Sequence, residues 1–112
     1  KEELIKFAKF FTQGSEFKEM YNLDALKIIK KAVPDACLAL VGGNRVFKDM
    51  ENVVKSGLVD AISLSRPLLH DPFIVSKFKK NLTDRSLCIS CGACLLNSEK
   101  GIYCHLPRNM TD

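Results

Sequence analysis

The chain has 112 residues, of which 46% are hydrophobic and 27% are charged. This length suits one small domain, and this composition suits a packed core and excludes a disordered chain. The longest stretch without a charged residue, Ser86 to Ser98, is too short for a membrane-spanning helix of about 20 residues. No secretory signal is visible, and because the first residue is Lys1 we expect a piece of a longer protein.

The net charge of +4 comes from 17 basic and 13 acidic residues. The densest basic run consists of Lys77, Lys79, Lys80 and Arg85. It indicates a solvated helix face, since a nucleic-acid surface needs tighter clustering and aromatic platforms, and the chain has no Trp and two Tyr. We therefore expect neither nucleic acid nor membrane as a partner.

The spacing of apolar residues predicts helices over residues 3–12 and 22–33. The first ends before Gly14, and we assign residues 1–19 to an N-terminal helix of unclear role. The second begins at Asn22, a plausible cap, and ends before Pro34. Its expected apolar stripe consists of Leu23, Leu26, Ile29 and Val33.

A continuous apolar run predicts a strand at residues 36–41, and the stretch from Val59 to Leu64 predicts a second apolar strand. Runs without polar alternation are typical of parallel strands that are buried on both faces, and Cys37 within the first run is expected in the core. A helix over 48–56 joins the strands and is expected to bury Met50, Val53 and Val54. The unit is therefore a strand–helix–strand crossover of the parallel kind.

A further helix is expected from Asp71-Pro72, with the aspartate as its N-cap and the proline at its first position. Its expected buried stripe consists of Ile74, Val75 and Phe78. Two parallel strands with open edges do not make a stable sheet, so we expect the chain to need the remainder of a larger α/β domain.

Ligands of parallel α/β folds bind beyond the carboxyl ends of the strands. Gly42 and Gly43 follow the first strand, and their backbone N–H groups are open to an anion; Arg66 follows the second strand and offers a charged fork. The alternatives are a tight turn without a ligand, and an Arg66 that only pairs with Asp60 or Asp71.

Four cysteines follow the spacing Cys-x2-Cys-x2-Cys-x9-Cys at Cys88, Cys91, Cys94 and Cys104. Without any sign of secretion we expect a reducing, cytoplasmic location, where such a cluster favours a metal or an iron–sulfur cluster over disulfides or incidental thiols. His105 offers a further zinc ligand, but a residue next to a ligand usually points away. We expect His70 to be solvated.

The stretch Leu38-Ala-Leu-Val-Gly-Gly-Asn-Arg45 and the stretch from Gly57 to Pro72 resemble the last two strands of the Old Yellow Enzyme family of FMN-dependent oxidoreductases. The run that begins Cys88-Ile-Ser-Cys91 resembles its iron–sulfur branch, which includes trimethylamine dehydrogenase and 2,4-dienoyl-CoA reductase. The resemblance covers about residues 20 to 108. It implies an α/β fold: residues 20–85 would be the C-terminal part of a (βα)8 TIM barrel, and residues 86–112 a cysteine-rich iron–sulfur segment.

The resemblance also implies roles for individual residues. Gly42 and Gly43 would donate backbone N–H groups to the FMN phosphate, with Asn44 at the edge of that loop. Ser65 would contribute its backbone N–H, and Arg66 would contact the phosphate near the flavin ring. The four cysteines would bind a [4Fe-4S] cluster close to the FMN. The last gap of nine residues is shorter than in the relatives, which leaves zinc or loss of the cluster as alternatives.

The implied enzyme takes electrons from NAD(P)H and reduces an activated double bond, or oxidises an amine. Its proton donor comes from earlier strands, so no catalytic residue is assigned in this chain, and its oligomeric state stays open. The implied partners are the small-molecule substrate and the rest of the barrel. Two alternatives stay open: a small zinc or iron–sulfur module that binds partners or transfers electrons without flavin, and a flavodoxin-like or Rossmann-type subunit. Neither strand is followed by the Gly-x-Gly-x-x-Gly pattern that the latter would favour.

Overall fold

The computed structural model describes residues 17–106, so the helix expected over residues 3–12 lies outside the described part. Its elements in chain order are α2 (Leu23–Ala32), β1 (Ala39–Val41), α3 (Phe47–Lys55), β2 (Ala61–Ser63), α4 (Arg66–His70), α5 (Ile74–Lys79), α6 (Ala93–Leu96) and a 3-10 turn at Ser98–Lys100. The helices predicted over 22–33 and 48–56 are confirmed as α2 and α3. No helix among residues 17–106 has the length and apolar character to cross a bilayer.

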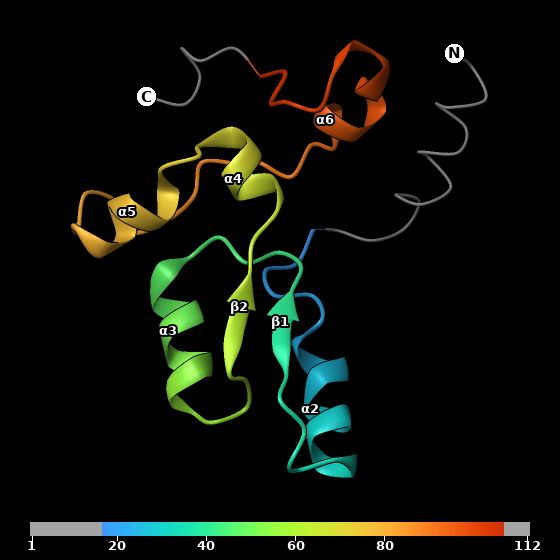
Figure 1. Cartoon of the computed structure of the whole chain (residues 1–112), viewed down its shortest axis with the longest axis vertical. Coiled ribbons are helices and arrows are strands. Elements are labelled where there is room, and N and C mark those ends of the chain that lie inside the picture. The colour runs from blue at the N-terminus through green and yellow to red at the C-terminus, as the bar shows by residue number, and fades with distance from the viewer. Residues whose placement is uncertain (1–16, 107–112) are drawn as a thin grey trace.

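The two strands form a parallel pair in which Ala39 faces Ala61 and Val41 faces Ser63. In Figure 1, α2 lies beside β1 and α3 lies beside β2. Both arrows point to the same end of the molecule, toward α4 and α6. The described part is thus a mixed α/β arrangement in which the carboxyl ends of both strands lie under the later segments of the chain.

The strands are shorter than predicted and are buried on only one face. Leu40 is 1% exposed, whereas Val41 is 48% exposed and Ala39, Ala61 and Ser63 are also exposed. The expectation of burial on both faces is therefore wrong for the described residues, because no described element covers the second face. A continuous apolar run indicates a strand with packed elements on both of its faces, and the described residues supply such packing on one face.

The core lies between the other face of the sheet, the helices and the segment before α2. Its buried apolar residues are Met20, Leu26, Leu40, Met50, Val59, Ile74 and Phe78. The ring of Phe47 on α3 stacks on that of Phe78 on α5 at a centroid distance of 5.1 Å. This stacking holds α5 against α3, although β2 and α4 separate the two helices in the sequence.

Other residues expected in the core are exposed in the described structure. Ile29 is 49% exposed, Val33 is 47% exposed and Val75 is 55% exposed, and Val54 and Cys37 are exposed as well. The helix predictions rest on periodicity and that of Cys37 on the apolar run around it, and both patterns mark a face that needs a partner without identifying that partner. Within residues 17–106 these faces have no cover.

Helix starts also differ from the prediction. Asn22 is the N-cap of α2, but its side chain makes no capping bond there, since its Nδ2 donates to the Val41 carbonyl at 2.8 Å. Asp71 does not cap a helix that begins at Pro72, because α5 begins at Ile74. The Asp71 carboxylate instead accepts the Phe73 N–H at 3.0 Å, which makes a short turn before the helix.

Candidate functional site

The ends of the two strands are held together by Asn44. This side chain is 3% exposed, and its Nδ2 donates to the carbonyl of Leu40 at 2.9 Å and to that of Ser63 at 3.1 Å. Its Oδ1 is buried and has no partner among the described residues. Asn44 therefore works inside the loop as a brace between β1 and β2, which its position at the edge of the turn did not indicate.

Gly42 and Gly43 turn the chain with φ values of +102° and +69°, a backbone region that favours glycine. A Cβ at Gly42 would lie 2.5 Å from the ring of Tyr21, and one at Gly43 would lie 2.9 Å from the backbone of Lys18 and Met20. The Met20 N–H also donates to the Gly43 carbonyl at 3.0 Å. The pair is thus required for close packing of the segment before α2, as well as for the turn itself.

A hollow of about 70 Å³ opens at the strand ends. It is lined by the five residues expected at an FMN phosphate, Gly42, Gly43, Asn44, Ser65 and Arg66, together with Tyr21, Val41, Arg45, Ser63, Leu64, Pro67 and Ser90. Sites that enclose small organic ligands usually measure about 300–1,000 Å³, so this hollow suits an anionic group and not a whole flavin. Backbone glycines and an arginine are a suitable donor set for a phosphate.

Arg66 is the first residue of α4 and is half-buried. The alternative that it merely pairs with Asp60 or Asp71 does not hold in the described structure. A bond from the Leu38 N–H at 2.8 Å lowers the pKa of Asp60, and a bond from Lys77 lowers the pKa of Asp71. Among residues 17–106 Arg66 forms no ion pair, so its charge is available to a ligand.

Ser65 stands at the N-cap of α4, and its carbonyl accepts the N–H groups of Leu68 and Leu69. Its side chain is exposed and makes no capping bond. The resemblance implies a site role only for the backbone N–H of Ser65, and among residues 17–106 its hydroxyl makes no hydrogen bond that would add another. The helix α4 itself was not predicted.

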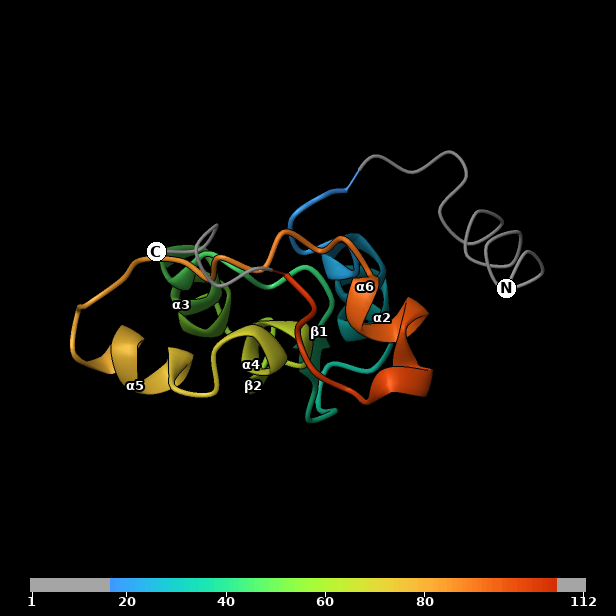
Figure 2. The ribbon, with the colours of Figure 1, turned by 90° about the horizontal axis from the view of Figure 1, so that it is seen from above.

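The segment that leads into the cysteines is paired with the loop that follows β1. Val46 and Arg85 form an antiparallel bridge, the Phe47 N–H donates to the Asp84 carbonyl at 2.9 Å, and the Ser86 N–H donates to the Arg45 carbonyl at 2.8 Å. Figures 1 and 2 show the cysteine-rich segment above the strand ends, near α4. The backbone thus holds the cysteines beside the candidate anion site.

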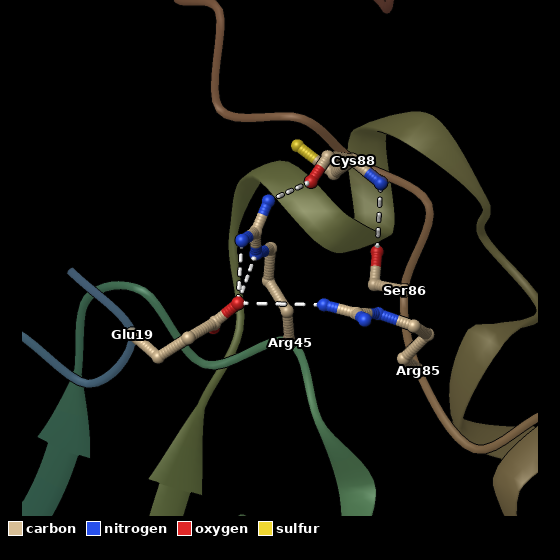
Figure 3. A network of polar contacts seen from close by, with 5 residues as sticks. All are labelled: Glu19, Arg45, Arg85, Ser86 and Cys88. Carbon is tan, nitrogen blue, oxygen red and sulfur yellow. Dashed lines mark hydrogen bonds and ion pairs between the residues drawn. The ribbon is translucent and has the colours of Figure 1, made fainter. Parts of the chain in front are cut away.

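Arg45 adds a network of side-chain contacts at the same place (Figure 3). Its Nε donates to Oε1 of Glu19 at 2.9 Å, its Nη2 bonds the same oxygen, and its Nη1 donates to the Cys88 carbonyl at 3.0 Å. The guanidinium also lies 4.1 Å from the centroid of the Phe17 ring. Arg85 lies 3.5 Å from the same Glu19 oxygen, at the more exposed rim.

A second, smaller hollow of about 20 Å³ is lined by all four clustered cysteines. Gly92 (φ +73°) turns the chain between Cys91 and Cys94, and α6 carries Cys94. Four thiols are a donor set that both iron–sulfur clusters and zinc take, but among residues 17–106 no three ligating side chains converge on one point as a bound ion requires. The structure therefore brings the four cysteines to the lining of one hollow.

The two histidines differ from each other. His70, which was expected to be solvated, is half-buried, and its Nδ1 lies 3.3 Å from Sγ of Cys104. His105 has its Nε2 3.3 Å from the Gly101 carbonyl and its ring 4.0 Å from that of Tyr103. The His70 contact joins residues 34 positions apart, so no local pattern in the sequence indicates it.

No protein-family model and no solved structure matches this sequence. A curated protein that does match is the 4,4'-dithiodibutanoate disulfide reductase of Rhodococcus erythropolis, which is 31% identical over 88 residues. The match covers 79% of this chain and 21% of the relative, so the chain spans about a fifth of that relative's length. The chain is therefore similar to one part of an oxidoreductase.

Proposed function

We propose that this chain is the C-terminal part of an FMN-dependent oxidoreductase with a TIM-barrel fold, and that it supplies the flavin phosphate site and a [4Fe-4S] site. One observation carries the proposal: Arg66 and Ser90 line both the hollow at the strand ends and the hollow of the cysteines. The two candidate sites thus share a wall, which is the arrangement that electron transfer between flavin and cluster needs.

The roles of this chain's own residues follow from their positions. Gly42, Gly43 and Ser65 offer backbone N–H groups to the phosphate, and Arg66 balances its charge. Asn44 keeps the two strand ends at a fixed separation, so these donors stay aligned. When bound, FMN supplies hydride and single-electron transfer, and the cluster supplies a one-electron site held by Cys88, Cys91, Cys94 and Cys104.

The exposed second face of the sheet supports the barrel. Ala39, Val41, Ala61 and Ser63 point away from the helices that cover the other face. In a barrel such residues alternate with the outward-facing ones and fill the interior. The remaining strands would supply that cover, and with it the proton donor and the nicotinamide and substrate contacts.

The matched relative narrows the choice of substrate. The name of the relative states that it reduces an organic disulfide. This favours the reduction of a small disulfide over the two other reactions considered, which are the reduction of an activated double bond and the oxidation of an amine. Reduction of a disulfide consumes two electrons and two protons and yields two thiols. Bound FMN would supply both electrons, with NAD(P)H as the expected source of hydride.

The flavin part of the proposal is tested on the full-length protein encoded by its gene. Loss of one charge-assisted bond costs about 1.5–3 kcal/mol, so Arg66→Ala should weaken FMN binding about 10- to 150-fold. Arg66→Lys keeps the positive charge but loses the forked guanidinium, so its FMN affinity should lie between those of the parent and of Arg66→Ala. Equal FMN affinity in all three proteins, measured by flavin fluorescence, contradicts the assignment.

The metal part is tested by iron and acid-labile sulfide content after anaerobic purification. Cys91→Ser should lose cluster iron, whereas Cys37→Ser, at the exposed cysteine before β1, should keep it. Stoichiometric zinc without flavin in the parent protein would favour the metal module instead. Iron retained in Cys91→Ser would remove this residue from the ligand set.

A further inference from the structure

We propose that His70 is a positioning residue for the cluster: its Nδ1–H donates a hydrogen bond to Sγ of Cys104 and makes the cluster easier to reduce. The inference rests on the proposed function, because it concerns a metal-bound Cys104. His70 closes α4, a helix whose first residue, Arg66, lines the cysteine hollow together with Leu69. The helix thus runs along that hollow and ends with the imidazole beside the last of the four cysteines.

The contact has the geometry of a bond between nitrogen and sulfur. Nδ1 and Sγ are 3.3 Å apart, and both side chains are shielded in part from water. A thiolate bound to iron carries no proton and is only an acceptor, so the proton of this bond has to reside on Nδ1. The neutral imidazole with its hydrogen on Nδ1 already satisfies this, and no change in protonation is needed.

The consequence follows from charge. Reduction adds an electron to the cluster and places more negative charge on its thiolate ligands. A donor aimed at one of these sulfurs stabilises the reduced state more than the oxidised state, and hydrogen bonds to the sulfurs are among the factors that set such potentials. His70 should therefore shift the reduction potential upward and favour the acceptance of electrons from the flavin.

The test is an anaerobic redox titration of the full-length holoenzyme, followed by the EPR signal of the reduced cluster. His70→Leu removes the donor and should shift the potential to a more negative value. His70→Asn places its Nδ2 where Nδ1 of the imidazole stood, so the reduction potential of this variant should stay close to that of the parent. Iron content is measured in parallel, since it reports cluster retention independently of turnover.

The outcomes separate the two proposals. An unchanged potential in His70→Leu, with the cluster present, overturns the hydrogen bond and leaves the proposed function standing. Loss of the cluster from His70→Leu, with retention at the parent potential in His70→Asn, supports the bond. Loss from both variants overturns it, as expected if the imidazole were itself a ligand. A parent protein without iron and sulfide overturns the cluster and this inference together.

Discussion

Replacement of Arg45 by alanine should loosen the start of the cysteine-rich segment. The Arg45 side chain is 17% exposed and bonds the Glu19 carboxylate, whose own side chain is 33% exposed, as well as the Cys88 carbonyl. Hydrogen bonds to charged groups contribute about 1.5–3 kcal/mol each, and the partial exposure of Glu19 places its share at the low end. The expected loss in local stability is about 2–3 kcal/mol, which raises the population of the locally opened state about 30- to 150-fold.

The assay is amide hydrogen exchange at Ser86 and Cys88, whose N–H groups donate to the Arg45 carbonyl and to Oγ of Ser86. Arg85→Ala is the matched control, because Arg85 approaches the same carboxylate at 3.5 Å with a side chain that is 50% exposed. Such a surface pair contributes about 0–1 kcal/mol. Equal acceleration of exchange in the two variants would refute the reasoning that Arg45 anchors this segment.

Two further predictions concern the strand ends and the turn before α5. Asn44→Ala removes two hydrogen bonds that contribute about 0.5–1.5 kcal/mol each, so it should lower the midpoint of thermal unfolding. The control Asn52→Ala, at an exposed position of α3, should leave this midpoint unchanged. Equal midpoints in the two variants would show that the hydrogen bonds of Asn44 are dispensable. The pKa of Asp71 lies below its ordinary value in the folded chain because Lys77 bonds its carboxylate. Its contribution to stability is therefore complete above the unfolded value and is lost as the pH falls through the folded one. Asp71→Asn should flatten this part of the acid unfolding curve, and an unchanged curve would contradict the pairing.

The sequence predicted features whose signals are local. The periodicity of α2 and α3, the Gly42-Gly43 turn and the cysteine spacing each occupy one short window, so the elements and the candidate ligands were found. The hydrogen bond from Asn44 to Ser63 joins residues 19 positions apart, so no short stretch of sequence indicates it. The composition of the turn gave no indication that this side chain faces inward.

The missed features depend on the fold. Glu19 bonds Arg45 across 26 positions, and His70 meets Cys104 across 34, so neither contact has a motif of its own. The helix α4 was missed because its five residues are too few to show a helical period. The exposed stripes show the opposite limit, since periodicity predicted burial of Ile29, Val33 and Val75 and these side chains are exposed in the described structure.

The two-stranded sheet has a practical consequence for anyone who handles this chain. Within residues 17–106 each strand has a single hydrogen-bonded neighbour, so both outer edges present backbone donors and acceptors next to an exposed apolar face. Such an edge is a template for any other extended peptide, including a second copy of the same molecule. We therefore expect this chain, when it is produced on its own, to self-associate through these edges to an extent that grows with its concentration.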